Sequence, residues 1–65
     1  MADTYERLDA MLGSAEQTFG KNDNDENVIV NRGSDSIYTE TFQKNGWVRT
    51  NYFYPDGTVE ELYEH

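Results

Sequence analysis

The stretch KNGWVRTNYFYPDGTVEE, residues 44–61, decides the fold. Two turn signals, Asn45-Gly46 and Pro55-Asp56-Gly57, enclose a run of aromatic and β-branched residues. Asn-Gly is the preferred pair of a two-residue hairpin loop, and Pro-Asp-Gly suits a three-residue loop whose Gly is left-handed. The stretch therefore predicts three antiparallel strands connected as a meander.

The lengths of the two loops set the register of the strands. If Asn45-Gly46 is a two-residue loop, Tyr38 lies opposite Phe53. If Pro55-Asp56-Gly57 is a three-residue loop, Phe53 lies opposite Val59. A two-residue Asp-Gly loop is the alternative at the second corner, and it would shift the last strand by one residue and exchange its faces.

The preferred registers give the meander two different faces. The face with more large aromatic residues is expected to pack on a helix, whereas the face rich in Thr and Tyr suits a half-exposed sheet surface. The first face carries Tyr38, Phe42, Trp47, Phe53, Val59 and Tyr63, and the second carries Ile37, Thr39, Thr41, Val48, Thr50, Tyr52, Tyr54, Glu60 and Leu62.

Upstream of the meander, the spacing of apolar residues predicts a helix over residues 4–19. Apolar side chains recur at steps of three and four, which places them on one stripe. Asp3 or Thr4 can cap the start and Gly20 fits the end. Gly13-Ser14 is the weak point in the middle, and one continuous helix that can bend there is expected. The stripe consists of Tyr5, Leu8, Leu12, Ala15 and Phe19.

Residues 21–27, KNDNDEN, read as a loop, and the β-branched run after them reads as a strand. The expected fold class is α+β, with one N-terminal helix packed on an antiparallel meander of three to four strands in a single domain over 1–65. The expected strands are 28–32, 36–43, 47–54 and 58–63.

Composition narrows the possible functions. The chain has no cysteine, which is compatible with a reducing cytoplasm, and the start MADTYERLDAMLG lacks the features of a signal peptide. The net charge of −8 repels nucleic acid and anionic membranes and attracts basic surfaces. We expect a cytoplasmic, non-enzymatic protein with no cofactor, no membrane contact and no direct contact with nucleic acid.

Acidic residues form the first candidate site. An array of carboxylates on a rigid helix can imitate the phosphate charge of DNA and occupy a basic groove. The alternative interpretation is an ordinary solvated helix face that maintains solubility. The candidate partner-binding residues of this array are Glu6, Asp9, Glu16, Asp23, Asp25 and Glu26.

The Thr/Tyr face contributes Tyr52, Tyr54 and Glu60 as further candidate partner-binding residues. Tyrosine offers a large contact area for little loss of entropy and is enriched at interfaces. Two alternatives are an ordinary water-exposed sheet face and burial of this face in a homodimer.

The loop Asp23-x-Asp25-x-Asn27 resembles the first half of a calcium loop. A calcium loop needs Gly at its sixth position and Glu at its twelfth, and here these positions hold Val28 and Ser34. No metal site is therefore predicted, and a weak Ca²⁺ or metabolite binder remains only an alternative.

The small size, the acidity and the absence of cofactor motifs resemble, in overall character, the small inhibitors encoded by phages and mobile elements. No family motif accompanies that resemblance. The sequence predicts a binding protein that acts as an inhibitor or decoy by covering a basic, nucleic-acid-binding surface of a protein or nucleoprotein partner. A homodimeric structural or regulatory domain, whose acidity serves solubility, is the first alternative.

Overall fold

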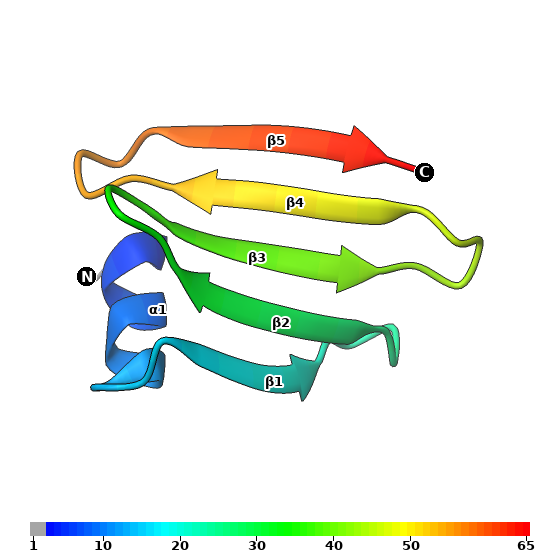
Figure 1. Ribbon diagram of the computed structural model, residues 1–65, viewed down its shortest axis with the longest axis horizontal. Helices are drawn as coiled ribbons and strands as arrows, with labels where there is room; N and C mark the ends of the chain where they lie inside the picture. The colour runs from blue at the N-terminus through cyan, green and yellow to red at the C-terminus, as the bar shows by residue number, and fades with distance from the viewer. Residues whose placement is uncertain (1–2) are drawn as a thin grey trace.

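A computed structural model describes residues 3–65. Within these residues one short helix and five strands follow each other, and the strands form one antiparallel sheet in the order β1-β2-β3-β4-β5. Figure 1 shows the helix beside one end of the sheet, close to β1, β2 and β3. The elements are α1 (Thr4–Leu12), β1 (Gln17–Lys21), β2 (Asn27–Arg32), β3 (Ile37–Phe42), β4 (Val48–Phe53) and β5 (Val59–Glu64).

The α+β class and the antiparallel meander are confirmed, but the sheet has five strands instead of three to four. The additional strand, β1, lies where the helix was predicted to continue. Of the two expected caps, Asp3 is the one that starts helix α1, because its Oδ1 accepts a hydrogen bond from the Glu6 N–H at 2.9 Å. It ends at Leu12 because Gly13 takes a φ of 60° and donates its N–H to the Asp9 carbonyl.

The prediction of one continuous helix over 4–19 was therefore wrong. Ala15 and Phe19 keep the spacing of the stripe but lie outside the helix, and Phe19 lies on β1 opposite Ile29 of β2. The predicted loop over 21–27 is confirmed for residues 22–26, which connect β1 and β2 as a hairpin; Lys21 and Asn27 belong to the two strands. Because this connection is short, residues 17–21 pair with β2 and form the fifth strand.

The loop of the β4–β5 hairpin is confirmed, and with it the predicted register. Phe53 pairs with Val59, and the Tyr54 N–H donates to the Thr58 carbonyl across the three-residue loop. Gly57 takes a φ of 92°, as its left-handed position requires. The pKa of Asp56 lies below its ordinary value because its carboxylate accepts hydrogen bonds from Thr58. The bond from the Thr58 side chain has the larger effect, and the bond from the Thr58 backbone N–H the smaller one.

The register of β3 against β4 differs from the prediction by one residue. The Gln43 N–H donates to the Trp47 carbonyl, so the loop contains Lys44 as well as Asn45 and Gly46. Ile37 consequently pairs with Phe53, a position that had been assigned to Tyr38. Because the side chains of a strand alternate between faces, this slip exchanges the two faces of β3.

We call the two sides of the sheet the helix face and the open face. The helix face presents Val30, Ile37 and Phe53 to α1, and the open face carries Tyr38, Thr50 and Tyr52, with no other described element covering it. Tyr38 and Phe42 were predicted on the helix face and lie on the open face, whereas Ile37, Thr39 and Thr41 lie on the helix face.

The hydrophobic core lies between α1 and the near ends of the central strands. Ile37 is fully buried, and Tyr5, Val28 and Phe53 pack around the buried cluster. A core this small leaves much of the sheet uncovered. The buried hydrophobic residues are Leu8, Leu12, Val30 and Ile37.

Candidate protein-binding surface

Three of the predicted partner-binding residues, Tyr52, Tyr54 and Glu60, come together on the open face. Tyr52 pairs with Glu60 across β4 and β5, and the Tyr54 hydroxyl donates a hydrogen bond to Oε1 of Glu60 at 2.5 Å. They border a shallow hollow of about 260 Å³. Its lining consists of Tyr52, Tyr54, Glu60, Glu61 and Leu62.

The tyrosines at this end of the open face sit in a negative environment. The hydrogen bond to Glu60 raises the pKa of Tyr54 to about 12, and the charges of Glu60 and Asp35 act in the same direction. The ring of Tyr38 lies 5.2 Å from that of Tyr52, which extends the aromatic surface onto β3. A negative, tyrosine-lined hollow favours a cationic side chain, because carboxylates and ring faces both attract positive charge.

Asp35 was not among the predicted site residues. It lies in the β2–β3 turn, which Figure 1 places at the same end of the sheet as the β4–β5 turn. Alternate turns of a meander return to the same end, so the order of the turns along the sequence was the signal that could have found it.

A polar network and apolar side chains share the rest of the open face. Gln17 Nε2 donates to Oδ1 of Asn31 at 2.7 Å, and Asn31 Nδ2 donates to Oε1 of Glu40 at 3.0 Å, which joins three strands. The open face also carries three exposed apolar side chains, one of which was predicted to lie on the helix. These residues are Phe19, Phe42 and Leu62.

The acidic residues predicted on the helix do not all lie on it. Glu6 lies in the first turn of α1, where a negative charge is favourable. Asp9 accepts a hydrogen bond from Arg32 Nη1 at 2.6 Å, so its charge is engaged within the molecule. Glu16 lies outside the helix, just before β1, where its carbonyl accepts the Arg32 N–H. Glu16 nevertheless stays near Asp9, because the charges of both carboxylates act on Arg32.

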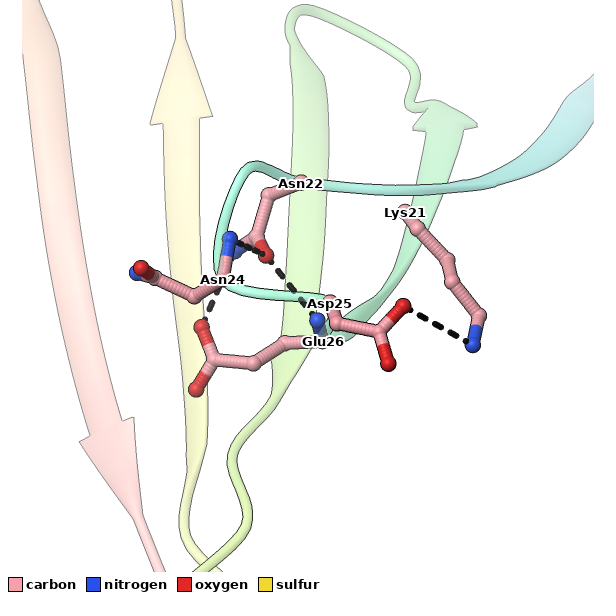
Figure 2. A network of polar contacts seen from close by, with 5 residues as sticks. All are labelled: Lys21, Asn22, Asn24, Asp25 and Glu26. Atoms are coloured by element: carbon pink, nitrogen blue, oxygen red, sulfur yellow. Dashed lines mark hydrogen bonds and ion pairs between the residues drawn. The ribbon is translucent and has the colours of Figure 1, made fainter.

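Three further acids, Asp23, Asp25 and Glu26, belong to the hairpin between β1 and β2, at the opposite end of the sheet from α1 (Figure 1). Figure 2 shows how this turn is organised around Asn22, whose Oδ1 accepts the N–H groups of Asn24 and Glu26 at 3.0 Å each. The structure therefore places these carboxylates far from Glu6 and Asp9 and divides the predicted array in two.

The turn uses its own polar groups internally. Asn22 Nδ2 donates to Oε1 of Glu26 at 2.9 Å, and Lys21 Nζ lies 3.3 Å from Oδ1 of Asp25 (Figure 2). Asp25 takes a φ of 62°, the left-handed position of the three-residue loop. The calcium-like spacing in the sequence therefore corresponds to a compact hairpin turn.

An aromatic cluster, none of whose members was predicted to be a site residue, lies on the helix face beyond the end that α1 covers. Trp47 stacks on Tyr63 with ring centroids 4.9 Å apart, and His65 lies edge-on to Trp47 at 4.8 Å. The Arg49 guanidinium lies 5.3 Å from the centroid of the Tyr63 ring and 3.5 Å from Glu61. The cluster packs together the side chains of β4 and β5.

Within residues 3–65, no three acidic or histidine side chains gather in a way that could hold a metal ion. In that same part of the chain, no helix has the length and apolar character needed to cross a membrane.

The comparisons with known proteins add no relative to this description. No protein-family model, no curated protein and no solved structure matches the chain.

Proposed function

We propose that this chain is a non-enzymatic binding protein that covers a basic surface of a protein partner with its open face. The convergence of Tyr52, Tyr54 and Glu60 on one negative hollow is the observation that carries the proposal. Tyrosines supply contact area and the carboxylate supplies charge complementarity, and both are common at protein interfaces.

The overall charge supports a basic partner. Among residues 3–65, the ion pairs engage Asp9, Asp25 and Glu61, whereas the net charge of −8 rests on 13 acids and 5 bases. Most of the negative charge is therefore not neutralised by an ion pair and can attract a partner at long range. An excess of negative charge speeds the encounter with a basic surface in a manner that salt weakens.

Covering a basic groove has a functional consequence. If the covered surface normally binds nucleic acid, this protein acts as an inhibitor or decoy, because the two anionic ligands compete for the same cations. Because the helical acids lie far from those of the β1–β2 turn, we propose the open face as the contact surface in place of the helix.

A homodimer is the second candidate because Phe19, Phe42 and Leu62 are exposed on the open face. Dimerisation through that face would remove them from water. It would also bring Glu40, Glu60 and Glu64 of the two copies together, which like-charge repulsion opposes. A basic partner satisfies both the aromatic and the acidic side chains, so we favour it.

The test is capture from cells of the source organism with three versions of the chain as bait. Glu60→Lys reverses the charge at the hollow, and Asp23→Lys makes the same change of charge at the far turn. We expect the wild type and Asp23→Lys to retain the same basic proteins in a salt-sensitive manner and Glu60→Lys to lose them. Identical retention by all three baits, or retention of acidic proteins only, would refute the proposal. Light scattering of the wild type at twice the monomer mass would instead support the dimer.

A further inference from the structure

Strand β5 is an edge strand whose outward backbone groups can be identified from the register. The hydrogen bond from the Tyr54 N–H to the Thr58 carbonyl makes this pair a hydrogen-bonded one, and such pairs alternate along an antiparallel ladder. Glu60 and Leu62 therefore direct their N–H and C=O groups toward β4. Val59, Glu61 and Tyr63 direct theirs away from the sheet, in a position to pair with another strand.

Charge selects the strand that can pair there. β5 has the sequence VEELYE, with three glutamates and no basic residue. If two copies of β5 pair in antiparallel fashion about Glu61, the Glu61 side chains of the two copies lie opposite each other. If they pair about Leu62, Glu60 of one copy lies opposite Glu64 of the other. Like charges directly opposite each other are destabilising, so a second copy is disfavoured and a basic strand is favoured.

We propose that an extended basic segment of the partner adds to the sheet as a sixth strand along β5. This inference rests on the proposed function and specifies how the partner binds. Main-chain hydrogen bonds to Val59, Glu61 and Tyr63 supply affinity, and alternate side chains of the added strand supply specificity.

The hollow on the open face lies beside this edge. Its walls come from Tyr52 and Tyr54 on β4 and from Glu60 and Leu62 on β5. A sixth strand runs about 4.8 Å from β5, so a Lys or Arg side chain that it projects on the open face lies next to Glu60. That cation reaches both the Glu60 carboxylate and the tyrosine rings.

The other edge of the sheet is a poorer site for a basic strand. β1 has only five residues and ends in Lys21, and basic residues protect edge strands from pairing. Figure 1 shows β1 and β5 at opposite margins of the sheet, so the two edges can be tested independently.

The probe is a short synthetic peptide of alternating lysine and valine, with a glutamate–valine peptide as its control. Amide hydrogen exchange of the labelled protein is followed by NMR at low salt. In the free protein we expect fast exchange at Val59, Glu61 and Tyr63 and slower exchange at Glu60 and Leu62. The lysine peptide should slow exchange at the three outward amides by about tenfold or more, as hydrogen-bonded protection requires. The β1 edge amides, such as Phe19, should not change.

A pair of variants separates strand addition from electrostatic attraction. Glu61→Pro removes an outward N–H, and proline is tolerated at such positions of an edge strand. Glu61→Ala removes the same carboxylate but keeps the N–H. We expect Glu61→Pro to bind the lysine peptide about tenfold more weakly than Glu61→Ala, with the chemical shifts of β2 and β3 unchanged in both.

The outcomes distinguish the two proposals. If the lysine peptide shifts the resonances of Tyr52 and Glu60 without protecting the outward amides, strand addition is wrong and the proposed function stands. If the lysine peptide shifts no resonances at low salt, the open face does not recognise basic segments and both fail. Protection of the outward amides in a dimer without peptide would show that the occupant is a second copy, which overturns the inference.

Discussion

Arg32 on β2 holds the C-terminal end of α1 in place through Asp9. Its Nη1 donates to Oδ1 of Asp9 at 2.6 Å, and Nη2 of the same guanidinium donates to the Gly13 carbonyl at 2.8 Å. The Asp9 hydrogen bond raises the pKa of Arg32 above its ordinary value. The Arg32 side chain therefore connects β2 both to α1, through Asp9, and to Gly13, where the helix ends.

This contact predicts that Arg32→Lys lowers the stability of the protein although the charge is kept. A lysine ammonium cannot present the planar fork that bonds a carboxylate and a carbonyl together. We expect a lower urea midpoint for Arg32→Lys. Arg49→Lys is the control, because Arg49 meets Glu61 at the more distant 3.5 Å, and we expect its midpoint to stay near that of the wild type. Equal midpoints for Arg32→Lys and the wild type would contradict the role of the fork.

The core predicts a large difference between two apolar truncations. Ile37 is 0% exposed, so Ile37→Ala should lower the free energy of unfolding by about 2–5 kcal/mol, from lost burial and the cavity left behind. Val59 is 54% exposed, so Val59→Ala should change it by about 0.5 kcal/mol or less. Chemical denaturation followed by tryptophan fluorescence measures both. Similar losses for the two variants would show that the core does not lie beneath α1.

The β1–β2 turn predicts a residue-specific response at Asp25. This residue occupies a left-handed position with a φ of 62°, which Gly adopts freely and β-branched residues adopt at a cost. Asp25→Val should destabilise the protein by about 1–2 kcal/mol, whereas Asp25→Gly should not destabilise it. Both variants lose the exposed ion pair to Lys21, so their difference reports the backbone alone. Thermal denaturation of the two variants provides the measurement, and identical melting temperatures would argue against the left-handed turn.

The Tyr54–Glu60 contact predicts a loss of stability in strong base. The folded protein holds the pKa of Tyr54 at about 12, against an ordinary value of 10.0. Between these values the folded state retains a proton that the unfolded state releases, so the stability contributed by this pair is complete below pH 10 and is lost as the pH rises through 12. Urea midpoints across this range should fall less for Tyr54→Phe than for the wild type. In an ultraviolet titration, Tyr54→Phe should lack the tyrosine ionisation near pH 12.

The β4–β5 hairpin was predictable from the sequence because its turn signal is local. Pro55-Asp56-Gly57 suits a three-residue loop, and a turn of known length sets the pairing of the strands on both sides. The β1–β2 hairpin was missed because Asp25 occupies the position where Gly normally marks such a turn. Asn22 stabilises this turn by accepting hydrogen bonds from two backbone N–H groups, and the acidic composition of the segment gives no sign of this role.

The candidate site was predictable only in part. Tyr52, Tyr54 and Glu60 lie on two strands joined by the correctly predicted turn, so their meeting followed from the register. The acidic array depended on the length of the helix, which the apolar spacing overestimated. Periodicity alone could not reveal that Gly13 ends the helix and that residues 17–21 pair with β2.

The sequence by itself determined the α+β class, the meander and the pairing of its last two strands, since these depend on residues close together in the chain. Tertiary structure alone decided where the helix ends, which face of β3 meets it and how the acids are distributed over the surface. These features depend on competition between distant segments for the same backbone hydrogen bonds and the same small core. Here residues 17–21 pair with β2 and do not extend the helix, and the hydrogen bond from Arg32 to Asp9 holds the shorter helix against the sheet.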